Sequence, residues 1–205
     1  MPENRTQRKR RAILDAATEA FLRSGYRGTS MDEIAAAAGV SKQTVYKQFA
    51  DKQRLFVEIV TGTVGEAADP VFDEVRELRE SGDLHADLRD LARRQLTAVM
   101  RPRVLRLRRL VIAEADRFPE LGRVFYERGA GRTVAALAAT FERLAERGLL
   151  RVADPVLAAN QFNWLFMAAP MNRAMLLGTD SVPGPEEIQR LADDAVRMFL
   201  AAYGR

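Results

Sequence analysis

Residues 30–49 read SMDEIAAAAGVSKQTVYKQF, and this stretch decides how the N-terminal part of the chain folds. Ser30 and Glu33 have the spacing of a capping box, in which each side chain satisfies the other residue's backbone N–H at a helix start. Gly39 stands where the backbone can need a positive φ, and Ser41 can cap a second short helix. Two short helices around a glycine-containing turn have the proportions of a helix-turn-helix.

The flanking segments predict helices on both sides of this motif. Apolar residues recur at helical spacing over about residues 6–24, and Gly25 follows as a stop signal. Asp51 can cap a fourth helix that begins at Lys52. The helix within residues 41–49 is too short to be stable alone, so it must pack on its neighbours.

The rest of the chain predicts further, longer helices. No segment alternates apolar and polar residues as a half-buried strand does. Asp69-Pro70 predicts a kink or a restart of the fourth helix, because proline has no backbone N–H to donate. We therefore expect an all-α fold of about nine helices. It would comprise a three-helix helix-turn-helix head at residues 1–52 and a six-helix body at residues 53–205.

The positive charge of the chain is concentrated in its first quarter. The 205 residues carry a net charge of +4, whereas residues 1–54 hold eleven basic and six acidic side chains, a net +5. The remaining residues therefore net −1. A basic segment attached to a nearly neutral body favours binding to a polyanion, although a solvated basic tail would have the same composition.

The residue types that carry most enzyme chemistry are scarce. The chain has no cysteine, and its single histidine, His85, lies in a charged stretch. It has no P-loop, dinucleotide-binding turn, metal-ligand spacing or nucleophile motif, so we expect no metal, no cofactor and no enzymatic activity. No apolar run approaches the roughly 18 residues of a membrane span, and the N-terminus does not resemble a secretory signal. We therefore expect a cytoplasmic protein that does not associate with membranes.

The third helix carries polar and aromatic residues suited to a DNA groove. Its first residues, Lys42, Gln43 and Thr44, would meet base edges, where they can contact guanine, adenine and the thymine methyl group respectively. Tyr46 and Lys47 extend this polar surface and can reach a base or a phosphate. Each residue alone could be an ordinary solvated side chain, so the prediction depends on their combination in a basic segment.

A family pattern extends over about residues 8–58, a quarter of the chain. The residues that carry it are RAILDAA at 11–17, Phe21, Gly25-Tyr26, the run from Gly28 to Lys42, Val45-Tyr46, Phe49, Lys52 and Leu55. In these positions the chain resembles the N-terminal domain of tetracycline-repressor-type (TetR/AcrR-type) regulators. The resemblance implies an all-helical homodimer whose head binds an operator and whose body binds an inducer.

The resemblance also implies which side chains contact DNA. By match to the motif, these are Ser30, Lys42, Thr44, Tyr46 and Lys52. Gln43, Lys47 and Gln48 depart from the residues that are commoner in the family, so no operator preference is carried over. A basic arm before the motif can add backbone or minor-groove contacts, or it can be a disordered tail. Its members are Arg5, Arg8, Lys9, Arg10 and Arg11.

The segment of residues 158–171 is apolar nearly all round, which predicts protein on more than one of its sides. Its own domain would cover one side and a second subunit the other. With the last helix as companion, we expect an antiparallel four-helix interface. The two heads would then reach half-sites about 34–36 Å apart, or a multiple, in a palindromic operator of double-stranded DNA. The residues expected at the interface are Gln161, Leu165, Ala169, Leu191, Ala195, Met198 and Phe199.

Aromatic and methionine side chains of the body predict an adaptable apolar ligand pocket. The candidates are Phe118, Phe125, Tyr126, Phe141, Phe162, Trp164, Phe166 and Met167. The alternative for each is a place in the ordinary core. The function expected is that of a homodimeric DNA-binding transcriptional regulator, a repressor released from its operator by a small apolar ligand. A constitutive DNA-binding protein without inducer and an activator are the alternatives.

Overall fold

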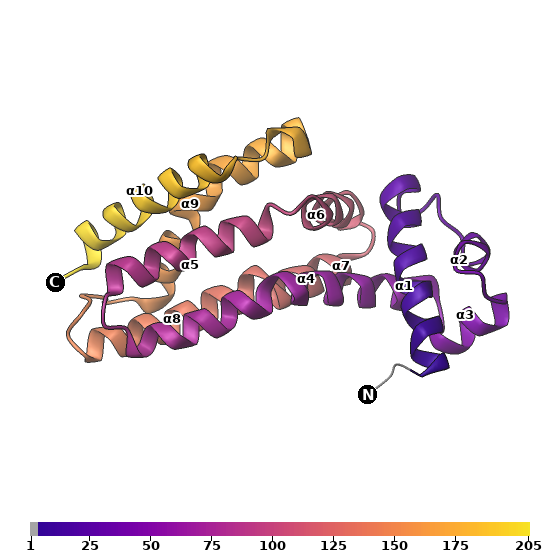
Figure 1. The fold of residues 1–205 in the computed structure, drawn as a ribbon, viewed down its shortest axis with the longest axis horizontal. Helices are drawn as coiled ribbons and strands as arrows, with labels where there is room; N and C mark the ends of the chain where they lie inside the picture. Colours follow the sequence, from indigo (N-terminus) through magenta and orange to yellow (C-terminus); the bar gives the residue numbers. More distant parts are fainter. Residues whose placement is uncertain (1–3) are drawn as a thin grey trace. The chain divides into compact units, whose positions relative to one another are not determined.

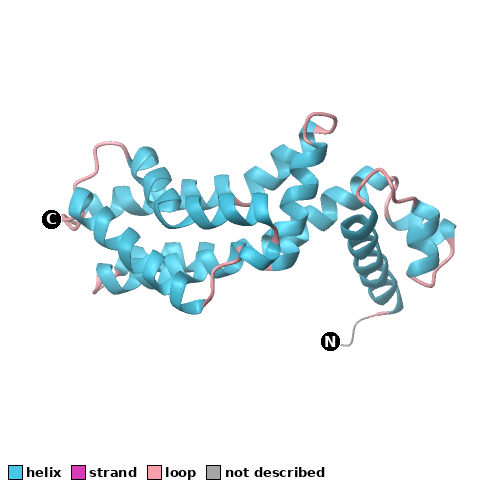
Figure 2. Ribbon diagram, turned by 90° about the horizontal axis from the view of Figure 1, so that it is seen from above, coloured by secondary structure: helices cyan, strands magenta, loops and turns pink. Residues whose placement is uncertain are grey.

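The computed structural model describes residues 4–205, which fold almost entirely into helices (Figure 2). Their only β-type pairing is an isolated bridge between Leu150 and Gly204. The predicted all-α fold is confirmed, and the described residues form ten α-helices where about nine were expected. The α-helices are α1 (Arg5–Ser24), α2 (Met31–Ala37), α3 (Lys42–Gln48), α4 (Lys52–Glu77), α5 (Leu84–Val99), α6 (Pro102–Glu114), α7 (Pro119–Arg128), α8 (Ala130–Glu146), α9 (Pro155–Leu177) and α10 (Pro185–Tyr203); the short 3-10 helices are η1 (Leu78–Glu80) and η2 (Thr179–Ser181).

Helix starts are stabilised by the capping residues that the sequence predicts. The Ser30 hydroxyl accepts a hydrogen bond from the Glu33 N–H at 3.2 Å, and the Glu33 carboxylate accepts one from the Ser30 N–H at 2.7 Å. The Asp51 carboxylate accepts a hydrogen bond from the Arg54 N–H at 2.7 Å at the start of α4. These bonds satisfy backbone donors that have no partner within the helix.

Helix α4 continues through Pro70 rather than restarting there. Proline removes one helical hydrogen bond, which weakens the helix locally. Side-chain contacts flank the proline on both sides, because Arg132 of α8 pairs with Asp69 and stacks on the ring of Phe72 at 4.0 Å. Helix α4 therefore continues at a proline where the local sequence favours a break, and it packs against α8 at this point.

The chain forms two compact units. The head unit comprises residues 4–63 and 106–125, and the body unit comprises residues 64–105 and 126–205. The head unit thus contains the helix-turn-helix together with much of α6 and α7. The division at residue 52 that the sequence suggests concerns functional parts, and it stays a prediction.

Side chains from several helices fill the core of the head unit. Ile13, Ile34 and Val45 are fully buried there and bring together α1, α2 and α3, which are labelled in Figure 1. The Phe56 ring lies 5.1 Å from both Phe21 and Tyr26. The short third helix is therefore held by tertiary packing, as its length requires.

The body unit is built around α5, α8, α9 and α10, and Figure 1 shows α10 running alongside α5 and α9. Its core contains a cluster of phenylalanine rings with centroids 5.0–5.7 Å apart, which are Phe141, Phe162, Phe166 and Phe199. Gln95 of α5 donates a buried hydrogen bond to Asn163 of α9 at 2.6 Å. Within residues 4–205, no helix is long and apolar enough to cross a membrane.

Candidate nucleic-acid interface

The turn between α2 and α3 is held by backbone and capping bonds. Gly39 has φ +63°, a conformation that residues with a side chain rarely adopt. The Val40 N–H donates to the carbonyl of Ala35 at 3.1 Å, and the Thr44 N–H donates to the Ser41 hydroxyl at 3.2 Å. These contacts define where α3 leaves the turn, and its buried residue, Val45, defines which face points inward.

The other face of α3 is exposed and carries the predicted base-contacting residues. Lys42, Gln43, Tyr46 and Lys47 are all exposed, with 60% of the Lys42 side chain and 44% of Tyr46 accessible. Thr44 is half-buried because it takes part in the cap. The structure therefore places these residues together on one surface, where a helix in a DNA groove would need them. Their contact with DNA stays a prediction.

Lys42 already has an electrostatic partner in the free protein. Its ammonium donates a hydrogen bond to the Asp32 carboxylate at 2.9 Å, and this bond raises the pKa of Lys42 above its ordinary value. Both side chains are exposed, so the pair contributes little to stability. A DNA phosphate or base acceptor would compete with Asp32 for the ammonium.

Ser30 and Lys52 have structural partners at the edge of this surface. Ser30 is exposed and caps α2. The Lys52 ammonium donates to the carbonyls of Tyr26 and Thr29, both at 2.9 Å, and lies 4.6 Å from the centre of the Tyr26 ring. Burial lowers the pKa of Lys52 below its ordinary value. Lys52 thus ties the start of α4 to the turn before α2, and a phosphate contact by it stays a prediction.

Much of the basic arm belongs to helix α1, which begins at Arg5 behind an Asn4 cap. The Arg10 guanidinium pairs with Glu58 of α4 and lies 4.9 Å from the centre of the Phe49 ring. Arg10 is therefore engaged within the head unit. Residues 1–3, which precede the arm, lie outside the described part of the chain.

An apolar groove of about 440 Å³ lies between α9 and α10 in the body unit. Trp164, Leu165 and Met198 in this groove are 46%, 37% and 54% exposed. The lining residues are Gln161, Trp164, Leu165, Met198, Phe199, Ala202 and Tyr203. Four of the residues predicted for the dimer interface are thus brought together, while Ala195 is buried within the protomer and Leu191 is half-buried. The interface itself stays a prediction.

The residues predicted to line one ligand pocket do not lie together. Some belong to the head unit, some are exposed, and the others are buried in the body core. Phe118 and Phe125 belong to the head unit, where Phe118 packs on Tyr26 at 5.0 Å. Tyr126 and Trp164 are exposed. The remaining candidates are buried in the body core against one another, which favours the alternative that they are core residues; they are Phe141, Phe162, Phe166 and Met167.

Replacing Phe162 by alanine tests whether this cluster is core. Phe162 is fully buried among three other rings, so we expect the change to lower the free energy of unfolding by about 3–5 kcal/mol. Urea unfolding followed by circular dichroism measures this loss. Tyr126→Ala is the control, because an exposed side chain should change stability by only about 0.5 kcal/mol. A loss as small as that for Phe162→Ala would instead indicate a ring that lines open space.

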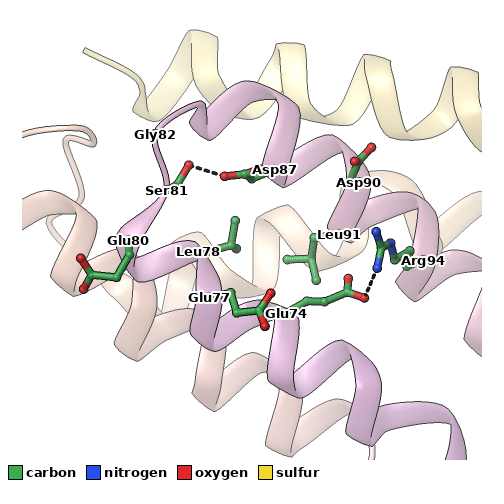
Figure 3. A pocket seen from close by; sticks show the side chains of 10 residues that line it. All are labelled: Glu74, Glu77, Leu78, Glu80, Ser81, Gly82, Asp87, Asp90, Leu91 and Arg94. Carbon is green, nitrogen blue, oxygen red and sulfur yellow. Dashed lines mark hydrogen bonds and ion pairs between the residues drawn. The ribbon is translucent and has the colours of Figure 1, made fainter.

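A second cavity of the body unit, about 290 Å³ in volume, has an acidic lining (Figure 3). It lies where α4, η1 and α5 meet. Figure 3 shows two of its carboxylates already engaged, since Glu74 pairs with Arg94 at 2.8 Å and Asp87 accepts a hydrogen bond from Ser81 at 2.5 Å. Glu77, Glu80 and Asp90 also line it. Such a lining does not suit a polyanion or the expected apolar ligand, and no cluster within residues 4–205 is arranged to hold a metal ion.

Sequence reasoning missed one charged residue that the structure makes conspicuous. Arg108 of α6 is half-buried, and its guanidinium lies 5.2 Å from the centre of the Phe125 ring. Helix α6 contains several arginines, and nothing in their local pattern shows which of them turns inward. The sequence predicted Phe125 as a residue of the ligand pocket, but it did not predict Arg108 beside it.

Comparisons with known proteins connect both parts of the chain to DNA-binding regulators. Residues 13–59 match the family of bacterial regulatory proteins, tetR family. Residues 86–205 match the C-terminal domain of AefR-like transcriptional repressors. The first match includes the helix-turn-helix, and the second includes the helices that carry the apolar groove.

Solved structures of several regulators resemble nearly the whole chain, and two of them serve as examples. One is described as a TetR-family transcriptional regulator from Mesorhizobium loti; it is 45% identical, with 99% of this chain and 100% of that chain aligned and a TM-score of 0.90. The other is the flavonoid-responsive regulator FrrA, which is 33% identical, with 96% and 97% of the chains aligned and a TM-score of 0.76.

Curated relatives align with about a quarter of this chain. AcrR of Shigella flexneri, an HTH-type transcriptional regulator, is 47% identical over 53 residues, which are 26% of this chain and 25% of that protein. YhgD of Bacillus subtilis is 45% identical over 53 residues, 26% and 28% of the two chains. The alignments thus span about a quarter of the length of these relatives.

Proposed function

The chain belongs to the TetR family of helix-turn-helix transcriptional regulators, and from this premise we propose that it acts as a homodimeric repressor released from its operator by a small ligand. The observation that carries the proposal is the exposed polar face of α3, with Lys42 and Tyr46 side by side on a capped and packed helix. In this proposal the protein works in the cytoplasm, where its operator is accessible, and has no enzymatic activity.

The apolar groove between α9 and α10 supports the homodimer. A protomer that leaves Trp164, Leu165 and Met198 exposed gains by covering them, because apolar area removed from water contributes about 25 cal/mol per Å². A second copy of the chain offers the same self-complementary surface. Two linked heads then bind one DNA molecule far more tightly than one head can.

The set of helices that form the head unit supports a response to ligand. Release requires that the ligand prefers a conformation in which the two heads fit the operator poorly. Helices α6 and α7 pack in the same unit as α3, through the Phe118–Tyr26 contact at 5.0 Å and the Gln53–Glu120 hydrogen bond. A shift of α6 and α7, or a tilt of α4, would therefore move the recognition helix. The similarity to FrrA, a flavonoid-responsive regulator, also favours an aromatic inducer.

Selection of genomic DNA fragments by the purified protein tests the proposal. We expect enrichment of a palindromic sequence, protected in footprinting over two half-sites. Adding a flavonoid such as naringenin, and then a wider panel of aromatic compounds, should identify one that lowers operator affinity about 5- to 150-fold, the usual range of such coupling. Enrichment without any effect of the panel would favour a constitutive regulator. No enriched sequence would contradict operator binding.

A further inference from the structure

Arg108 is a half-buried cation on α6 with an aromatic neighbour. Its guanidinium lies 5.2 Å from the centre of the Phe125 ring on α7, and both residues belong to the head unit. One helical turn further along α6, Ile112 is 61% exposed. Because residues four apart are neighbours on a helix surface, Ile112 lies on the same side of α6 as Arg108.

No counterion accompanies this cation. Within residues 4–205, Arg108 makes neither a hydrogen bond nor an ion pair, and its Nε is buried without an acceptor. Burial lowers the pKa of Arg108, and no neighbouring carboxylate offsets that effect. An arginine nevertheless stays protonated in proteins, so the charge is retained, and among the described residues its partner is the Phe125 ring.

Arg132 of the body unit has both an aromatic neighbour and a carboxylate partner. Its guanidinium also stacks on a phenylalanine, with the centre of the Phe72 ring 4.0 Å away, but it pairs with the Asp69 carboxylate as well. Arg108 has the ring without the carboxylate. A guanidinium suits a carboxylate because its planar donors can form two parallel hydrogen bonds.

We propose that Arg108 anchors the inducer by its carboxylate, with the apolar body of the ligand packed along Phe125 and Ile112. The proposal rests on the function proposed above and narrows the ligand to an aromatic carboxylic acid in its ionised form. An uncharged apolar compound would leave the Arg108 guanidinium without an anion and would gain only the apolar contacts.

The anchor site lies in the same compact unit as the recognition helix. Phe125 belongs to α7, whose Glu120 accepts a hydrogen bond from Gln53 of α4. A carboxylate that draws Arg108 and Phe125 together would therefore act on helices that contact the start of α4. Such an effect couples the ligand to DNA binding only if the ligand prefers one arrangement of these helices.

Matched acid and amide probes test the anchor. Binding of 1-naphthoate and 1-naphthamide to the full-length protein is measured by calorimetry. We expect wild type to bind the acid at least about tenfold more tightly than the amide, since hydrogen bonds to charged groups are the stronger ones. Arg108→Gln should abolish this preference. Arg106→Gln should keep it, because Arg106 is exposed on another side of α6.

Several outcomes would overturn the proposal. Wild type could bind neither probe, it could bind both equally, or Arg108→Gln could retain the preference for the acid. The protein could also bind naphthoate through Arg108 but select no operator sequence. That result would contradict the proposed function and would still support the carboxylate site at Arg108.

Thermal unfolding distinguishes a ligand-binding role of Arg108 from a structural role. Arg108→Met keeps the apolar stem against Phe125 and removes the uncompensated charge, so its melting temperature without ligand should equal or exceed that of wild type. Naphthoate should then raise the melting temperature of wild type but not of Arg108→Met. A variant that melts several degrees lower without ligand would show a structural role for Arg108 and overturn the proposal.

Discussion

Replacing Lys42 or Tyr46 by alanine should weaken operator binding about 5- to 150-fold without unfolding the protein. A well-placed contact to a base contributes about 1–3 kcal/mol, and each factor of ten corresponds to about 1.4 kcal/mol. Both side chains are exposed on α3, so their truncation leaves the buried contact of Val45 intact. Fluorescence anisotropy with a labelled operator measures the loss, and circular dichroism shows that the fold persists.

The matched control removes a positive charge from the body unit rather than from the head unit. Arg103 is exposed near the start of α6, in the body unit, and its change to alanine should alter operator affinity less than twofold. If Lys42 contacts a phosphate, its loss should also reduce the dependence of log affinity on log salt by about one. If wild type, Lys42→Ala and Tyr46→Ala bind the operator with equal affinity, α3 is not the recognition helix.

The helix-turn-helix could be predicted from sequence because its signals are local. Ser30, Glu33 and Asp51 form capping bonds with residues three positions away, so their spacing alone indicates where α2 and α4 begin. The glycine at position 39 has the positive φ that its place in the turn suggested. Each of these features depends on a few consecutive residues, which a single sequence displays in full.

The surroundings of the candidate pocket residues could not be predicted in the same way, because they depend on contacts between distant segments. Phe162 and Trp164 are only two residues apart, yet one is fully buried and the other is 46% exposed. The neighbours that decide this belong to α8 and α10. In α6, Arg108 and Arg109 are half-buried whereas Arg103 and Arg106 are exposed, and the sequence does not show what the helix packs against. Periodicity predicts that a helix has faces, but not which partner each face meets.

Replacing Leu165 by arginine should convert the proposed dimer to a monomer and lower operator affinity at least about a hundredfold. Leu165 lies in the groove between α9 and α10, where a second protomer would bury the new charge without a partner. In the isolated protomer Leu165 is 37% exposed, so the arginine can reach solvent and the fold should survive. Analytical ultracentrifugation measures the oligomeric state, and anisotropy measures operator binding.

Val156→Arg is the control for this change because the two positions share a helix but not a face. Val156 is 58% exposed and precedes Leu165 by nine residues, which places it about half a turn away around α9. We expect this variant to remain dimeric and to bind the operator as wild type does. The loss of affinity in Leu165→Arg should arise from separating the two heads, since one head loses the effective concentration that a linked partner provides, commonly a factor of about 10²–10⁴. A dimeric Leu165→Arg protein would place the interface elsewhere, whereas a monomer with full operator affinity would show that one head suffices for DNA binding.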